Sequence, residues 1–176
     1  SDEQSYTLTV NNVNDLPTFT TTPLTGVAQG QRYLYRFEAT DIDVGDNVTY
    51  SIQTKPSWLT YNVGSDSIFG EPTNLHVQSS PHTVTVRAHD GTGYTDQTFQ
   101  ITVTNVNDAP KITSTPNNNA YEEQLYRYII IGEDDDVEDS VLTYTAVQNT
   151  ASSWLTFSND TLYGTPAQSD IGTYNV

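Results

Sequence analysis

The chain of 176 residues carries 22 acidic and six basic side chains, which gives a formal net charge of −16 at pH 7. This charge excludes nucleic acid as a partner and a polybasic role at a membrane surface, because both need positive charge on the protein. Hydrophobic residues make up 35% of the chain and twelve tyrosines are spread along it, so the acidic excess does not indicate disorder. What remains is a strongly hydrated surface or a surface that collects cations.

A repeat at an offset of 93 residues organises the sequence. Val13-Asn14-Asp15-Leu16-Pro17 returns as Val106-Asn107-Asp108-Ala109-Pro110, and a repeat of this length corresponds to one small domain. We therefore expect residues 1–14 to be the terminal strand and linker of a preceding repeat. Residues 15–107 then form one complete repeat, and residues 108–176 form a second one that stops before its last strands.

The predicted elements are strands, because apolar and polar residues alternate with a period of two. In chain order the clearest strands lie at residues 6–10, 33–39, 48–52, 84–88 and 99–103. Short turns rich in Asp, Asn and Gly separate them. About seven short strands per repeat are typical of an antiparallel sandwich, so the predicted fold class is all-β, with tandem seven-stranded Greek-key β-sandwiches of cadherin or immunoglobulin type.

Acidic and amide side chains stand where this fold would bring loops together. Asp41, Asp43 and Asp46 follow the strand at 33–39, and Asp90 follows the strand at 84–88. The linker contributes Asn14 and Asp15 to the same end of the sandwich. Asp, Asn and Gly are also the default turn residues, so a single copy fits ordinary turn chemistry as well as a ligand site. Recurrence of the pattern in the second repeat favours the ligand site.

A hard divalent cation would offset the repulsion between these carboxylates. Carboxylates that crowd together raise each other's pKa, and no Lys or Arg stands in these motifs. Calcium takes about 6–8 oxygen ligands, whereas the lack of cysteine and the presence of only three histidines disfavour zinc and copper. We therefore predict bound calcium (Ca2+), with a complete site only in the first repeat, because the counterpart of Asp90 would follow residue 176. The predicted ligands are Asn14, Asp15, Asp41, Asp43, Asp46 and Asp90, and in the second repeat Asn107, Asp108, Asp134, Asp136 and Asp139.

Several motifs occur together in a fixed order, namely Val13-Asn14-Asp15-x-Pro17, Asp41-x-Asp43-x-x-Asp46, Trp58-Leu59, Gly70-x-Pro72 and Asp90-Gly91. In this combination the chain resembles the dystroglycan-type cadherin-like repeats and the related immunoglobulin-like repeats of the cadherin superfamily. Those are tandem repeats of large surface or secreted proteins. The resemblance implies calcium at the joint between repeats and work in cell adhesion or as a stalk. It also implies an extracellular or cell-surface location, in a membrane-anchored parent protein.

The resemblance carries over to single positions. Asp41 and Asp43 match the cadherin Asp-x-Asp ligand pair, and Asp90 matches the later single aspartate. Val13 stands where a cadherin linker has an asparagine ligand, so we expect fewer ions per joint than cadherins hold. With bound calcium two neighbouring repeats would hold a fixed angle, and without it the linker would act as a hinge.

The alternative function is that of a carbohydrate-binding module of a secreted or surface protein. Stacking faces would come from the aromatic residues Tyr61, Tyr94, Tyr121, Trp58 and Trp154. A tryptophan between a polar loop and a leucine is more typical of a core plug. No enzyme activity is expected, because the three histidines have no nucleophile arranged beside them.

Further partners and modifications follow from smaller signals. Neighbouring repeats of the same array are the expected partners, together with a surface protein or a glycan ligand. The strand at residues 6–10 matches the strand type that the second repeat lacks, which predicts strand exchange between copies. Asn47 and Asn159 stand in sequons for N-linked glycosylation.

Overall fold

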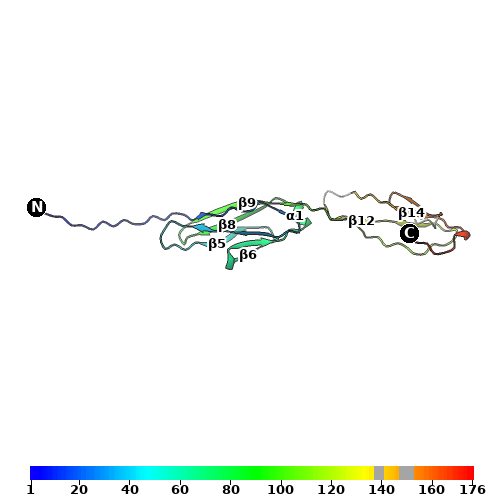
Figure 1. Cartoon of the computed structure of the whole chain (residues 1–176), viewed down its shortest axis with the longest axis horizontal. Coiled ribbons are helices and arrows are strands. Elements are labelled where there is room, and N and C mark those ends of the chain that lie inside the picture. The colour runs from blue at the N-terminus through cyan, green and yellow to red at the C-terminus, as the bar shows by residue number, and fades with distance from the viewer. Residues whose placement is uncertain (137–140, 147–152) are drawn as a thin grey trace. The chain divides into compact units, whose positions relative to one another are not determined.

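The computed structural model describes residues 1–136, 141–146 and 153–176. These residues divide into two compact units, Ser1–Val106 and Asn107–Val176. Residues 1–14 run as an extended segment without assigned strand at the start of the first unit (Figure 1). No helix among the described residues is both long enough and apolar enough to cross a membrane.

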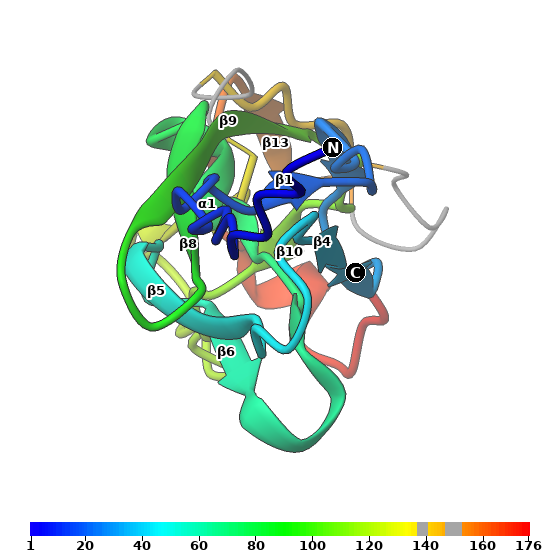
Figure 2. The ribbon, with the colours of Figure 1, turned by 90° about the vertical axis from the view of Figure 1, so that its left-hand side faces the viewer.

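The first unit is a β-sandwich, seen from the side in Figure 1 and from one end in Figure 2. One sheet has the order β2-β9-β8-β5, the other has the order β3-β7-β6, and β1 pairs with β4. The strands are β1 Thr18–Phe19, β2 Gly26–Ala28, β3 Tyr33–Arg36, β4 Ala39–Thr40, β5 Thr49–Thr54, β6 Leu59–Asn62, β7 Ser67–Gly70, β8 His82–His89 and β9 Tyr94–Thr104. Their described pairings are antiparallel except that β2 lies parallel to β9.

The strands predicted at residues 48–52, 84–88 and 99–103 are confirmed, and their alternation decides which side chains form the core. The strand predicted at residues 6–10 is not formed, because that segment pairs with none of the described strands. Val84, Val86 and Ala88 of β8 are fully buried, while the residues between them remain accessible. Across the sandwich, the rings of Tyr35 and Phe99 meet edge to face with centroids 5.6 Å apart. The two sheets therefore share one core, made of alternate residues from both.

The strand predicted over residues 33–39 is interrupted. β3 ends at Arg36 and β4 begins at Ala39, because the backbone N–H of Phe37 donates to the carbonyl of Asp66 and Thr20 pairs with Glu38.

Two short helices were not predicted, the 3-10 helix η1 Val63–Ser65 and the α-helix α1 Asn74–Gln78. Both are too short to show a helical period in the sequence.

The repeated Trp and Gly motifs have one physical cause. The Trp58 ring packs on the core, and a Cβ at Gly70 would overlap the Trp58 carbonyl oxygen. The second unit has the same arrangement, because a Cβ at Gly164 would overlap the carbonyl oxygen of Trp154. Glycine at this position allows the two backbones to approach closely.

The second unit reproduces one sheet of the first. Its sheet β11-β14-β13 matches β3-β7-β6, and the pair β10–β12 matches β1–β4. The elements are β10 Lys111–Ile112, β11 Tyr126–Ile129, β12 Gly132–Glu133, β13 Thr156–Ser158, β14 Thr161–Gly164 and the 3-10 helix η2 Gln168–Asp170.

The other sheet has no counterpart among the described residues of the second unit. Residues 119–121 correspond to β2 and residues 143–146 to the described part of a β5 counterpart, yet neither segment is in a strand. In the first unit β2 pairs with β9 and β5 pairs with β8.

Candidate functional site

Three carboxylates meet at one end of the first sandwich. Asp41 follows β4, Asp46 lies in the turn after it, and Asp90 follows β8. One oxygen atom of each carboxylate lies within 4.8 Å of the others. The loops converge because β4 and β8 end at the same pole of the sandwich, as the alternation and the turn residues predicted.

The electrostatics of this cluster are unfavourable for the protein alone. Loss of hydration raises the pKa of Asp46, and the nearby charges of Asp43, Asp41 and Asp90 raise it further. Asp41 Oδ2 is buried without a hydrogen-bond partner. The ion pairs of the described residues, Arg87–Asp96 and Lys111–Asp135, do not include the three carboxylates.

Asp90 is the best stabilised member of the cluster. Its Oδ1 accepts hydrogen bonds of 2.6 Å from the backbone N–H groups of both Thr92 and Gly93. The bond from Gly93 lowers the pKa of the buried Asp90 side chain the most, and the bond from Thr92 comes next. The Asn14 amide lowers this pKa further. Asp90 is therefore ionised at neutral pH, with Oδ2 directed toward the linker.

The linker is tied to the same end of the sandwich by hydrogen bonds. Asp43 Oδ1 accepts a hydrogen bond of 2.9 Å from Asn12 Nδ2, and Asp43 Oδ2 accepts one of 2.7 Å from the backbone N–H of Asp15. Asn14 Nδ2 donates to the carbonyl of Asp15 at 2.7 Å and to Asp90 Oδ2 at 3.1 Å. Asp43 therefore holds the linker, while Asp41, Asp46 and Asp90 face one another.

The second unit repeats the linker geometry. The backbone N–H of Asp108 donates to Asp136 Oδ2 at 2.6 Å, as Asp15 donates to Asp43. Asp134 Oδ1 accepts a hydrogen bond of 2.9 Å from the backbone N–H of Asp136. Asn107 Nδ2 donates a hydrogen bond of 2.7 Å to the carbonyl of Asp108. Asp136 is only 4% exposed, and its Oδ1 is buried without a partner.

The predicted ligands thus take different places. Asp41, Asp46 and Asp90 form the cluster, and Asn14 reaches it. Asp43 is occupied by the linker, and the contact made by Asp15 is through its backbone N–H. The counterparts Asn107, Asp108, Asp134 and Asp136 keep the linker contacts of the second unit, and Asp139 lies outside the described residues.

Sequence reasoning missed three contributors. Asn12 holds Asp43, and the N–H groups of Thr92 and Gly93 hold Asp90. The signal for the second pair was present in Asp90-Gly91-Thr92-Gly93, because an aspartate that starts a tight turn often accepts the backbone N–H groups two and three residues later. Asn12 gave no comparable signal, since only the path of the linker places it beside Asp43.

The donor set fits a hard cation. The atoms that converge are carboxylate oxygens, with one amide beside them, and calcium binds such oxygens with flexible geometry. The Asn14 amide now donates to Asp90, and rotation by half a turn would present its oxygen instead. A bound cation would also give the orphaned Asp41 Oδ2 a partner.

The aromatic candidates for sugar stacking are mostly engaged with the protein. Trp58 and Tyr61 pack against the core, and Trp154 lies edge-on to Tyr126 and Tyr174. One face of Tyr94 is covered by the Arg87 guanidinium, whose carbon is 3.5 Å from the ring centroid.

The remaining candidate residues have structural or exposed settings. His76 and His82 surround the Trp58 ring at centroid distances of 6.0 and 5.8 Å. His89 Nδ1 accepts a hydrogen bond of 2.8 Å from the backbone N–H of Gly91. The sequon residues Asn47 and Asn159 are exposed.

Comparison with protein families gives one match. The family described as "Putative Ig domain" matches residues 16–104 and again residues 109–176. Comparison with curated proteins gives no match.

Solved structures share the fold at low sequence identity. Human protocadherin-24 EC1-2 is 16% identical with a TM-score of 0.53, and the match covers 90% of this chain and 82% of that one. Mouse cadherin-23 EC22-24 is 17% identical with a TM-score of 0.50, covering 88% of this chain and 55% of that one. An endo-fucoidan hydrolase from glycoside hydrolase family 107 is 24% identical with a TM-score of 0.42, and the match spans 89% of this chain but only 25% of the hydrolase. The two cadherin structures show that the fold is the sandwich of cadherin extracellular repeats.

Proposed function

We propose that this chain, which belongs to the family described as "Putative Ig domain", is a calcium-binding tandem repeat of an extracellular adhesion or stalk protein. Calcium would bind where the linker meets the repeat that follows it and would stiffen the array at that joint. The sandwich fold and the family membership support the repeat architecture. The calcium site rests on the geometry of the first unit.

One observation carries the calcium proposal. Asp41, Asp46 and Asp90 bring their oxygen atoms within 4.8 Å of one another, and the buried Oδ2 of Asp41 has no partner. Ordinary turn chemistry explains the bonds made by Asp90, but it gives no reason for Asp41, which faces two further carboxylates, to keep a buried oxygen without a partner. A divalent cation would compensate the charge and occupy the free lone pairs.

The residues of the site have separate roles in this proposal. Asp41, Asp46 and Asp90 would hold the cation, and Asn14 would add its amide oxygen after rotation. Calcium supplies two positive charges and several coordination positions when it is bound. Asp43 keeps the linker against the sandwich through Asn12 and Asp15.

The mechanical consequence follows from this division of roles. A linker held only by hydrogen bonds to carboxylates can detach, because a hydrogen bond to a charged group contributes about 1.5–3 kcal/mol. A cation shared by Asn14 and the loop carboxylates would add a stronger attachment and limit rotation of the preceding repeat. Extracellular calcium modules work with Kd values of about 10⁻⁴–10⁻³ M, so the joint would be stiff where calcium is abundant.

Thermal unfolding of the full chain in millimolar calcium and in chelator tests the proposal. A cation that binds only the folded protein raises its stability by mass action, so Tm should rise with calcium concentration. Magnesium serves as the control, because it needs smaller, more regular octahedral sites and should raise Tm less. Equal melting curves in calcium and in chelator would contradict a calcium site.

A further inference from the structure

The linker of the first unit meets its sandwich over a glycine. Gly93 lies between β8 and β9, and a Cβ at this position would overlap Leu16 Cδ2. The same Cβ would lie 3.8 Å from both Asn14 Nδ2 and Asp90 Oδ2. Linker, turn and carboxylate cluster therefore meet at one residue that has no side chain.

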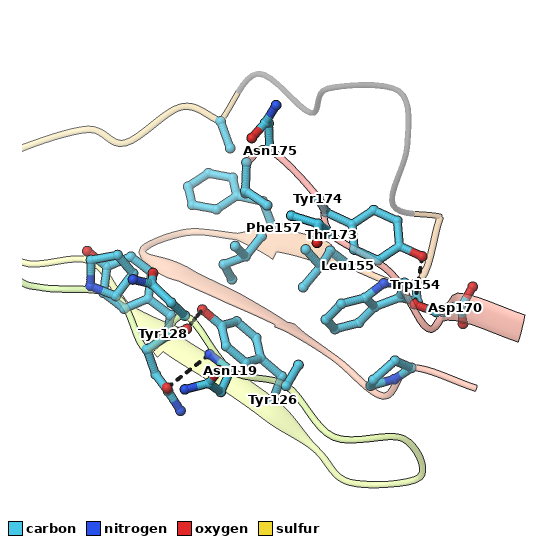
Figure 3. A pocket seen from close by; sticks show the side chains of 18 of the residues that line it. Asn119, Tyr126, Tyr128, Trp154, Leu155, Phe157, Asp170, Thr173, Tyr174 and Asn175 are labelled. Atoms are coloured by element: carbon cyan, nitrogen blue, oxygen red, sulfur yellow. Dashed lines mark hydrogen bonds between the residues drawn. The ribbon is translucent and has the colours of Figure 1, made fainter. Parts of the chain in front are cut away.

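The groove of the second unit is a different kind of hollow. Its volume is about 930 Å³, and Figure 3 shows Tyr126, Trp154 and Leu155 among the side chains that line it. These are core residue types, and no residue of the linker at 105–110 lines the groove. A linker side chain is instead received over Gly93, in the first unit.

Backbone conformation does not explain why position 93 is glycine. Gly91, two residues earlier, has a φ of +107°, a conformation that favours glycine. Gly93 is not among the residues with positive φ, so its backbone would accept other residue types. The space taken by Leu16 is what excludes a side chain, and we call this contact the Leu16 seat.

The linker enters the sandwich at the Leu16 seat. Pro17 is fully buried, and the exposed fraction falls from 82% at Val13 to 54% at Leu16. Asn14 and Leu16 stand two positions apart, and in an extended chain such side chains point to the same side. Because Leu16 rests on the turn, Asn14 is directed at the same turn, where it donates to Asp90. The seat therefore sets the position of the Asn14 amide.

The turn that carries the seat also holds Asp90. The backbone N–H of Gly93 donates a hydrogen bond of 2.6 Å to Asp90 Oδ1. The backbone N–H of Asp90 donates one of 3.2 Å to the carbonyl of Gly93. A shift of Gly93 would therefore move Asp90 as well, so the docking of the linker and the geometry of the cluster are coupled through these two residues.

We propose that Leu16 is a positioning residue for the cation site: seated on Gly93, it holds the linker so that Asn14 stays beside the carboxylates. Leu16 itself offers no ligand atom and acts through Asn14. Binding of the cation and docking of the linker then favour each other by the same factor, because coupling between two binding events is reciprocal. This inference rests on the proposed calcium function, while the seat itself can be tested without calcium.

The residue before the proline differs between the two linkers. The second linker has Ala109 at the place of Leu16, between the retained Asp108 and Pro110. Alanine has no atom that corresponds to Leu16 Cδ2, so it cannot fill a seat of this kind. The residue at this position therefore sets how firmly each linker docks, and the joints of one array differ in firmness.

Hydrogen exchange of the full chain in chelator tests the seat by itself. The backbone N–H of Asp15 is bonded to Asp43, so its exchange reports how often the linker detaches. Leu16→Ala should speed this exchange by about three- to tenfold, because it removes part of an apolar contact. Leu16→Met keeps the apolar volume and should exchange like the parent chain. Val13→Ala is the matched control, since Val13 lies in the same linker and is largely exposed.

Gly93→Ala tests the contact from the other side. Its Cβ takes the place of Leu16 Cδ2, so the linker should detach at least as often as in Leu16→Ala. The variant that carries both changes should exchange no faster than Leu16→Ala alone, because the truncated side chain leaves room for the new Cβ. General damage to the turn would instead add to the loss caused by Leu16→Ala.

Calorimetric titration with calcium tests the link to the cation site. Leu16→Ala should weaken calcium binding by about twofold or more, although no ligand has changed, because a smaller fraction of the linkers is docked. Val13→Ala should bind calcium like the parent chain. In the parent chain, calcium should in turn slow the exchange of the Asp15 N–H.

Different results would overturn the inference and the proposed function. Parent-like exchange of Leu16→Ala in chelator, or losses that add up when Gly93→Ala is combined with it, would refute the seat. Parent-like calcium affinity of Leu16→Ala, where the parent chain binds calcium, would refute the coupling. A parent chain that binds no calcium would refute the proposed function and the role of Leu16 toward the cation, and the exchange experiment would still decide whether Leu16 holds the linker.

Discussion

Asn14 and Asp90, 76 positions apart in the sequence, are joined by a hydrogen bond of 3.1 Å from Asn14 Nδ2 to Asp90 Oδ2. This contact places a linker amide at the edge of the carboxylate cluster. The linker and the cluster are therefore parts of one structure, and a change in the charge of the cluster should alter how firmly the linker is held.

Replacing Asp46 by Asn should have opposite effects with and without calcium. The folded-state pKa of Asp46 is raised by lost hydration and by neighbouring carboxylates, so its contribution to stability is present below the unfolded pKa of about 3.8 and is lost as the pH rises through the folded value. At neutral pH in chelator, Asp46→Asn should therefore raise Tm. In calcium titrations followed by calorimetry, the same variant should bind the ion more weakly.

Glu71→Gln provides the matched control for that experiment. It removes one negative charge from an exposed residue next to Gly70, which pairs with Tyr33 at the start of β3. Asp46 follows β4, which comes after the other end of β3. Both Tm in chelator and calcium affinity should match the parent chain. A Glu71→Gln variant that behaved like Asp46→Asn would indicate an effect of net charge alone.

Gly70→Ala should unfold the first unit or destabilise it by more than about 4 kcal/mol, because the new Cβ would overlap a backbone oxygen that cannot move independently. Gly26→Ala is the control, since its Cβ would find its nearest neighbour, the Thr102 carbonyl oxygen, at 3.9 Å. Urea unfolding followed by tryptophan fluorescence measures both. Parent-like stability in Gly70→Ala would refute the close approach of the two backbones.

Ile101→Ala should cost about 2–5 kcal/mol of unfolding free energy, because Ile101 is fully buried between the sheets and its truncation leaves a cavity. Thr102→Ala, one residue later on the exposed face of β9, should change stability by no more than about 0.5 kcal/mol. Chemical unfolding at equilibrium measures the difference. Similar losses in both variants would mean that β9 does not present the face described above.

The stability of the first unit should fall between neutral and mildly acidic pH in a manner that depends on His76. Burial lowers the pKa of His76 from its usual 6.5, and the charge of His82 lowers it further. A group with a lowered folded pKa contributes stability above the unfolded value and loses it as the pH falls through the folded one. Melting curves at about pH 7.5 and pH 5 should therefore show a smaller drop in Tm for His76→Asn than for the parent chain.

The Asn side chain in that variant can still accept the 2.8 Å hydrogen bond that Thr73 N–H donates to His76 Nδ1. His89→Asn is the control, since His89 lies at the other end of β8 from the ring cluster around Trp58. It should retain the parent loss of Tm. Equal pH dependence in His76→Asn and the parent chain would exclude His76 as the cause.

The sequence could predict those parts of the fold that depend on local alternation. Val84, Val86 and Ala88 alternate with polar residues, and a buried strand follows directly from that period. The five residues of α1 are too few to show a period, and its helix depends on the backbone bond from His76 to Thr73 and on the histidine that reaches back to the cap. The parallel pairing of β2 with β9 was not predictable, because three residues of β2 give no signal for a partner 76 positions away.

The same distinction applies to the site. The positions of Asp41, Asp46 and Asp90 after their strands were enough to predict that they meet, because the ends of the strands fix the loops. The role of Asp43 depends on the path of the linker, which brings the Asn12 amide and the Asp15 N–H to its two oxygens. Sequence spacing alone could not separate a carboxylate that faces the cluster from one that faces the linker.

The central position of β9 also has a consequence for biosynthesis. β9 is the last strand of its repeat to leave the ribosome, yet it lies between β2 and β8 and closes the core. A nascent repeat must therefore wait, with its inner aromatic face exposed, until residues 94–104 have been synthesised. Chaperones would meet each repeat in this half-built form, and the rate of translation through the final strand would set how long that exposure lasts.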